Sequence, residues 1–176
     1  KLIYPNPSLD VGQAKDIIKV SIKQFYGIEI NDFAVSVAKT ALWIAESQML
    51  EETKDIFYAD WDFLPLKTYT NIHEGNALRM DWNRVVPNYA CHYIMGNPPF
   101  IGHQWRNSEQ IRDMEIVFHD LGKHGKLDYV CAWYNKAINY MHKTKIRAAL
   151  VSTNSICQGE SVSIRWQNKK KKNLEI

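Results

Sequence analysis

The sequence predicts an α/β fold with a parallel β-sheet, and three observations support this class. Short apolar runs of strand length alternate along the chain with longer segments of helical periodicity. Polar residues follow these runs, and the 45% hydrophobic content of the 176 residues is enough for one core. Strands that alternate with helices imply parallel pairing, and ligands then bind beyond the carboxyl ends of the strands.

The N-terminal half carries a strand, a helix, a loop and a second strand. After the first apolar run, Asn31 or Asp32 can cap the helix, because a short side-chain oxygen accepts a free amide of the first turn. An aromatic-rich, aperiodic stretch that contains Pro65 follows the helix and reads as a loop. The predicted elements are a strand over 24–30, a helix over 33–49, a loop over 55–70 and a strand over 71–78.

The C-terminal half continues this alternation. The apolar run of residues 91–96 stops before Pro98 and Pro99, which lack the amides that a sheet ladder needs. The predicted elements are a strand over 91–96, a helix over 108–118, a helix over 127–142, a strand over 146–152 and a helix that begins within 161–166. The polar residues at predicted strand ends, which a parallel sheet brings to one edge, are Glu29, Asn76, Asn97, Thr153 and Asn154.

The sharpest signal is the tetrapeptide Asn97-Pro98-Pro99-Phe100. From average composition, Asn or Asp followed by two prolines and Tyr or Phe arises by chance in roughly one chain in several hundred of this length. The alternative is a strand-terminating turn without chemistry. Its position directly after an apolar strand favours a functional loop.

The tetrapeptide suits methylation of an exocyclic amine, a poor nucleophile because its lone pair is delocalised into the ring. The Asn97 side-chain oxygen and the Pro98 carbonyl can both accept hydrogen bonds from the amine, which favours a tetrahedral nitrogen with its lone pair free. The prolines hold both acceptors in place before the substrate arrives. Phe100 can stack on the base, which must then have left the duplex.

With these residues the chain resembles the adenine-N6 methyltransferase region of bifunctional type IIG and IIL restriction-modification enzymes, within the class I S-adenosylmethionine-dependent methyltransferase superfamily. The resemblance covers about residues 20–165, and the order and spacing of several blocks make it specific. These blocks are residues 25–31, 75–78, 97–102, 127–130 and 151–156 with Gln158-Gly159-Glu160. The resemblance implies a Rossmann-like sheet and a DNA adenine methyltransferase.

The resemblance also implies S-adenosylmethionine as the cofactor. Glu29 would bind its ribose hydroxyls, as an acid at a strand end does in dinucleotide folds, with Ile30 packed against its adenine. A surface acid or helix-cap partner is the alternative for Glu29. Asn76 and Ala77 would also contact the cofactor. Asn76 matches a position where the family often has Asp to bind the adenine amine; a turn residue is the alternative there.

Thr153 and Asn154 would line the pocket of the target base, or would simply form a turn. The implied substrate is double-stranded DNA with a flipped adenine. We expect no metal site, because the three cysteines are far apart and the six histidines lack a ligand spacing. No apolar run is long enough for a membrane span and no secretory signal opens the chain, so we expect a soluble protein. The resemblance implies the prokaryotic cytoplasm.

We expect this fold to be present only in part. The glycine-rich cofactor loop that should precede Glu29 has no counterpart, since Val11-Gly12-Gln13 does not fit its pattern. The first strand would therefore be missing. The chain ends soon after Trp166, so we expect the last strands of the sheet to be missing as well. Residues 1–166 are predicted to form a partial methyltransferase catalytic domain, and 167–176, which contain a lysine run, a disordered basic tail. The rest of a parent polypeptide would supply the glycine-rich loop, a target-recognition domain and any nuclease domain, so the fragment should bind cofactor weakly and be inactive alone.

Two other functions stay open at this level. A protein glutamine-N5 methyltransferase uses the same acceptors on a side-chain amide, although the segments around residues 153–160 favour DNA. A non-catalytic nucleic-acid-binding module would use the basic tail and exposed aromatic residues, with binding that weakens strongly as salt is raised.

Overall fold

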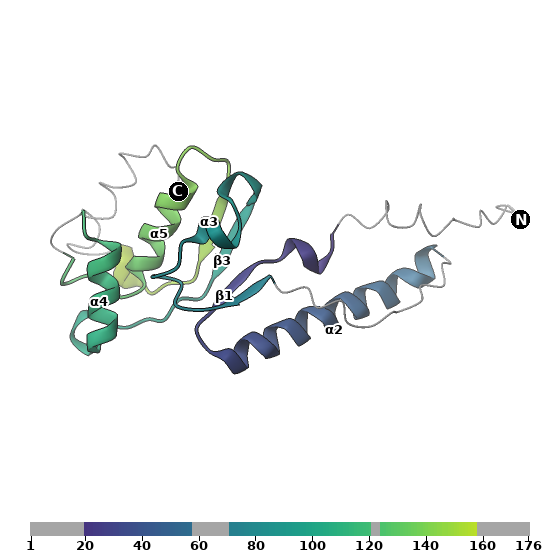
Figure 1. The fold of residues 1–176 in the computed structure, drawn as a ribbon, viewed down its shortest axis with the longest axis horizontal. Helices are drawn as coiled ribbons and strands as arrows, with labels where there is room; N and C mark the ends of the chain where they lie inside the picture. Colours follow the sequence, from purple (N-terminus) through teal and green to yellow (C-terminus); the bar gives the residue numbers. More distant parts are fainter. Residues whose placement is uncertain (1–19, 58–70, 121–123, 158–176) are drawn as a thin grey trace, which may run out of the picture. The chain divides into compact units, whose positions relative to one another are not determined.

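The computed structural model of the chain describes residues 20–57, 71–120 and 124–157 (Figure 1). Most of the predicted loop, the predicted helix within 161–166 and the basic tail over 167–176 lie outside the described residues. The chain divides into two compact units, Lys1–Glu74 and Gly75–Ile176. No described helix combines the length and the hydropathy that crossing a bilayer requires.

The first unit contains two short parallel strands and one long helix. A 3-10 turn over Ile22–Gln24 precedes β1 (Gly27–Glu29), and α2 (Asp32–Phe57) leads to β2 (Ile72–Glu74). The register pairs Glu29 with Glu74 at the carboxyl ends of β1 and β2, and α2 packs on both strands. A Cβ at Gly27 would lie 2.9 Å from Ile72 Cδ1, so the Ile72 side chain packs directly over Gly27.

The predicted start of α2 is correct to within one residue, but the helix continues beyond its predicted end at residue 49. The helix begins at Asp32, and the Asn31 side-chain oxygen accepts a hydrogen bond from the Ala34 amide at 3.0 Å. The prediction of a loop from Asp55 was wrong for its first residues, since α2 continues to Phe57. No glycine or proline interrupts residues 50–57, and glutamate and lysine favour helix there even after the apolar periodicity fades.

The second unit carries the other parallel pair, flanked by helices. Its elements, in order, are α3 (Trp82–Val85), a 3-10 turn (Asn88–Ala90), β3 (Tyr93–Gly96), a 3-10 turn (His103–Trp105), α4 (Ser108–Val117), α5 (Cys131–Met141), β4 (Arg147–Leu150) and a 3-10 turn (Asn154–Cys157). β3 and β4 pair in parallel from Tyr93↔Arg147 to Gly96↔Leu150. Helices α4 and α5 pack together, and α5 also contacts β4 (Figure 1).

Helix α4 matches its predicted span, whereas α5 begins later than predicted. Asn107 starts α4 with a capping box. The Asn107 side-chain oxygen accepts a hydrogen bond from the Gln110 amide at 2.9 Å, and the Gln110 side-chain oxygen accepts one from the Asn107 amide at 3.0 Å. The predicted start of the next helix at Leu127 was wrong: it begins at Cys131. Leu127 and Val130 are buried but precede the helix. Their three-residue spacing in the sequence therefore resembled one face of a helix, although both residues pack into the core from outside it.

The core of the second unit lies where α4, the turn before α5, the start of α5 and the turn that carries Leu78 meet. The cluster consists of Leu78, Met114, Phe118, Leu127, Tyr129, Val130, Cys131 and Ala132. The charged residue Asp113 is buried beside Met114 with only 2% of its surface exposed. The predicted α/β class with parallel pairing is confirmed for these elements by both strand pairs.

Candidate functional site

The tetrapeptide begins directly beyond the carboxyl end of β3. The last sheet contact is the hydrogen bond from the Val151 amide to the Gly96 carbonyl, at 2.9 Å. Pro98 is buried and anchors the loop, whereas Asn97 and Phe100 are exposed, Phe100 by 44%. Among the described residues the Asn97 side chain has no hydrogen-bond partner, so both polar atoms of its amide are available to a ligand.

Thr153 and Asn154 follow β4 at the same edge as Asn97. Because β3 and β4 are parallel neighbours, their carboxyl ends lie together, as predicted from the positions of these polar residues. Both side chains are exposed. The Thr153 carbonyl accepts a hydrogen bond from the Ile156 amide at 3.2 Å and opens the 3-10 turn that carries Asn154.

Asn76 lies in a tight turn that follows Gly75. Gly75 has φ = 153°, where a side chain is strained, and a Cβ there would collide with the Met80 sulfur. The Asn76 carbonyl accepts hydrogen bonds from the Arg79 and Met80 amides, both at 3.0 Å. The indole nitrogen of Trp82 donates to the Ala77 carbonyl at 2.9 Å, so Ala77 is held by its backbone.

A buried carboxylate holds the Asn76 side chain from the other side. Asp113 Oδ2 accepts from Asn76 Nδ2 at 3.0 Å and from the Tyr129 hydroxyl at 2.6 Å, and Asp113 Oδ1 accepts from Arg79 Nε at 2.6 Å. Burial opposes ionisation of Asp113, but the hydrogen bonds from Tyr129, Asn76 and Arg79 and the Arg79 charge outweigh it and lower the pKa of the carboxyl. Burial and the hydrogen bond to Asp113 raise the pKa of Tyr129.

The same network reaches the tetrapeptide loop. The backbone amide of Tyr129 donates to the Ile101 carbonyl at 2.9 Å, one residue after Phe100. Ile101 packs against the core cluster, and the Tyr129 ring meets Trp133 edge-on at 5.1 Å between centroids. The Asn76 turn and the loop that follows β3 are therefore connected through Asp113 and Tyr129.

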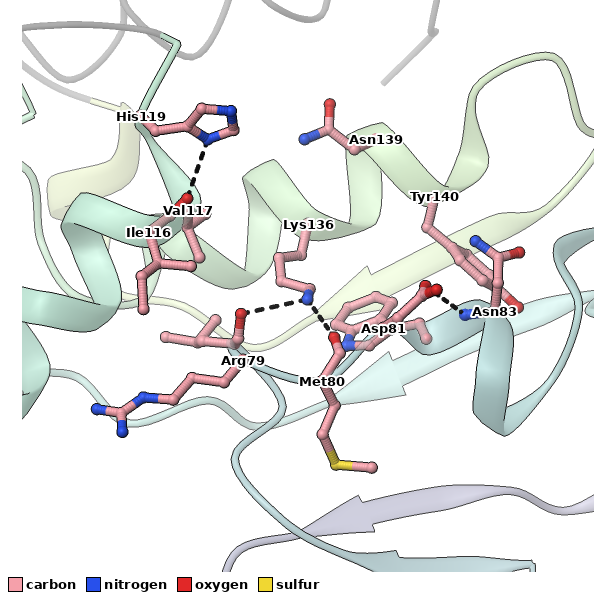
Figure 2. A pocket seen from close by; sticks show the side chains of 12 residues that line it. Arg79, Met80, Asp81, Asn83, Ile116, Val117, His119, Lys136, Asn139 and Tyr140 are labelled. Carbon is pink, nitrogen blue, oxygen red and sulfur yellow. Dashed lines mark hydrogen bonds between the residues drawn. The ribbon is translucent and has the colours of Figure 1, made fainter.

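Lys136 of α5 fixes the other end of the Asn76 turn. Its ammonium donates to the Leu78 carbonyl at 3.2 Å and to the Met80 carbonyl, and it lies 5.8 Å from the Trp82 ring centroid. Figure 2 shows the Lys136 side chain reaching from α5 to these carbonyls, on the wall of a pocket of about 380 Å³. Burial lowers the pKa of Lys136, while the Asp81 charge opposes this.

Sequence reasoning singled out none of Arg79, Asp113, Tyr129 and Lys136. One signal was present for Asp113: it lies on α4 next to Met114 and four residues before Val117, so an acid occupies the apolar stripe of the helix. Acids are rarely fully buried without partners, which makes such a position notable. The partners themselves are 16 to 37 residues away in sequence and carry no local signal.

Glu29 and Ile30, the other predicted cofactor residues, belong to the first unit. Glu29 is the last residue of β1, is half-buried, and one of its carboxylate oxygens accepts from the Asn31 amide at 3.0 Å. A carboxylate has about four acceptor positions, so this bond leaves capacity for a ligand's hydroxyls. Ile30 is 69% exposed. No group of three metal-ligating side chains gathers within the described ranges.

Comparison with known proteins gives consistent matches. Residues 7–176 match the family described as "MmeI, DNA-methyltransferase domain". DNA methyltransferase A of Bacillus subtilis (strain 168) is 43% identical over 170 residues, covering 94% of this chain and 19% of the relative. The solved structure of the type IIL restriction-modification enzyme MmeI in complex with DNA matches with a TM-score of 0.81 at 42% identity, covering 87% of this chain and 21% of that chain. The chain thus spans about a fifth of the length of these relatives.

Proposed function

The chain belongs to the MmeI DNA-methyltransferase domain family of restriction-modification enzymes, and on that premise we propose that it transfers a methyl group from S-adenosylmethionine to adenine N6 in double-stranded DNA. The observation that carries this proposal is the Asn97 side chain, which lies exposed at the carboxyl edge of β3 and has no hydrogen-bond partner among the residues that the structure describes. An amide oxygen in that position suits an amine substrate that arrives from solvent.

The proposed chemistry rests on two acceptors. The Asn97 side-chain oxygen and the Pro98 carbonyl each accept one N–H of the adenine amine, which draws the nitrogen toward a tetrahedral geometry and frees its lone pair. Bound S-adenosylmethionine supplies the methyl group. Buried Pro98 keeps the acceptors in place, so little reorganisation is needed when the base arrives. Phe100, 44% exposed, offers a ring face for stacking on the flipped base.

Thr153 and Asn154 are proposed to complete the base pocket. They follow β4, the strand paired with β3, and both side chains are exposed at the edge where Asn97 lies. A hydroxyl and an amide can bond to the edge of a base that has left its Watson–Crick pair.

The residues proposed for the cofactor have the chemistry that S-adenosylmethionine requires. The Glu29 carboxylate retains acceptor capacity for ribose hydroxyls, exposed Ile30 offers apolar surface to the adenine, and Asn76 and Ala77 lie in a fixed turn after β2. The full activity is assigned to a polypeptide that also carries a glycine-rich cofactor loop and a target-recognition domain.

The test uses the full polypeptide that carries this chain, with labelled S-adenosylmethionine and duplex DNA. Mass spectrometry of the digested nucleosides should reveal N6-methyladenine, and Asn97→Ala should lower the rate by about a hundredfold or more. Asn139→Ala, which removes another exposed asparagine, is the matched control and should leave the rate unchanged.

Three outcomes would contradict the proposal. Methylcytosine as the product would refute the adenine assignment. Label found only in a release-factor peptide would favour glutamine methylation. Salt-sensitive DNA binding that persists in Asn97→Ala, without any methyl transfer, would support a non-catalytic module.

A further inference from the structure

The orientation of the Asn76 amide is fixed by two contacts of opposite character. Asp113 Oδ2 lies 3.0 Å from Asn76 Nδ2, and an ionised carboxylate can only accept hydrogen bonds. The Leu78 amide lies 2.9 Å from Asn76 Oδ1, and a backbone amide can only donate. Exchanging the oxygen and nitrogen of the amide would place like partners against each other on both sides. The Asn76 oxygen is therefore held as an acceptor, with a second lone pair unused by the Leu78 amide.

Asp113 is itself held rigidly. It is 2% exposed, and its two oxygens accept three hydrogen bonds, from Asn76, from Arg79 Nε at 2.6 Å and from the Tyr129 hydroxyl at 2.6 Å. Arg79 is in turn paired with Glu109 Oε2 at 2.5 Å. These partners keep the carboxyl ionised, so it acts on Asn76 as an acceptor over the whole neutral pH range.

We propose that Asp113 is a positioning residue that orients the Asn76 side chain to accept a hydrogen bond from the adenine amine of the cofactor. This inference rests on the proposed function, because it assumes that S-adenosylmethionine binds at the Asn76 turn. Asp113 does not touch the ligand. It acts by excluding the flipped amide, which would present an N–H donor to the ligand's own donor.

The same contact explains why an amide suits position 76. A carboxylate at this position would lie about 3 Å from the Asp113 carboxylate, and two like charges so close cannot both ionise without a large cost. Exchanging the two residues would restore complementarity, because an amide at 113 can donate to a carboxylate at 76. The carboxylate at 76 would again offer only acceptors to the ligand.

The experiment measures how strongly the site prefers a ligand with the adenine amine over the same ligand without it. The full polypeptide carrying this chain is titrated calorimetrically with S-adenosylhomocysteine and with the same compound whose adenine amine is replaced by hydrogen. The wild type should prefer the amine by roughly tenfold, the effect of one hydrogen bond. Asp113→Asn should reduce this preference, because an amide at 113 can pair with either orientation of Asn76, and only the Leu78 amide then opposes the flipped one.

Three further variants keep the test decisive if Asp113→Asn folds poorly. Asn76→Asp alone should weaken binding of both ligands, and the exchange Asn76→Asp with Asp113→Asn should recover both the binding and the preference for the amine. Tyr129→Phe removes a hydrogen bond from Asp113 but leaves the Asn76 contact in place. It should lower the melting temperature while the tenfold preference remains.

The outcomes separate this inference from the function on which it rests. If the wild type prefers the amine and Asp113→Asn keeps that preference, the positioning role is refuted and the cofactor assignment stands. If Asn76→Asp alone binds as the wild type does, the inference also fails. If the wild type binds neither compound, the proposed cofactor site is refuted, and this inference is refuted with it.

Discussion

Truncating Asp113 to alanine should destabilise the second unit by about 2–4 kcal/mol, and the structure accounts for this magnitude. The Tyr129 hydroxyl, in a residue 5% exposed, would lose its acceptor, and a buried unsatisfied hydroxyl costs about 1–3 kcal/mol. Asn76, half-buried, would lose one further hydrogen bond worth about 1 kcal/mol. Arg79 adds little, because its side chain is 37% exposed and water can replace the lost contact.

The assay is urea unfolding followed by tryptophan fluorescence and compared with the wild type. With a slope of about 2 kcal/mol per molar urea, the midpoint should fall by roughly 1–2 M. The matched control is Glu109→Ala, which removes the other acid paired with Arg79 on the same helix. Glu109 is 65% exposed, so its midpoint should barely move. If Asp113→Ala shifts the midpoint no more than Glu109→Ala does, the buried network is not a source of stability and the reasoning is wrong.

Three further predictions concern the same turn. Because the pKa of Asp113 is lowered below its ordinary value of 3.8, its stabilising effect is fully present above about pH 4 and is lost as the pH falls through the lower folded-state pKa, so Asp113→Asn should show a shallower acid transition in circular dichroism. Gly75→Ala should cost roughly 1–3 kcal/mol in thermal unfolding, since φ = 153° strains any side chain and the added Cβ meets Met80; an unchanged melting temperature would contradict this. Lys136→Met should keep most of the packing but lose the bonds to the Leu78 and Met80 carbonyls, at a cost of about 1–2 kcal/mol. Faster hydrogen exchange in residues 78–83 would report that loss, and unchanged exchange would argue against it.

The order of strands and helices was predictable because its signals are local. Asn31 and Asn107 cap helices through contacts within three residues, and the two prolines after β3 end the strand where they stand. Boundaries were less predictable. The helix expected from Leu127 begins at Cys131, because burial of Leu127 comes from the core of the second unit and not from a helical face.

The position of each candidate residue was also predictable, but its surroundings were not. Asn97 and the pair Thr153–Asn154 follow strands that prove to be parallel neighbours, so their placement at one edge followed from alternation of strands and helices alone. For Asn76 the sequence offered either a turn residue or a ligand-binding residue. In the structure Asn76 lies in a turn, and its side chain also donates a hydrogen bond to Asp113.

The sequence by itself determined the family, the parallel α/β class and the tetrapeptide that carries the proposed chemistry. Each of these depends only on short contiguous segments and on the spacing between them. Only the tertiary structure decided that Asp113, Arg79, Tyr129 and Lys136 hold the Asn76 turn. These contacts join segments 16 to 58 residues apart, and which side chains face one another there depends on how α4 and α5 pack. An acid in the apolar stripe of α4 marks Asp113 in the sequence, but its three donors carry no such signal, since the fold alone brings them together.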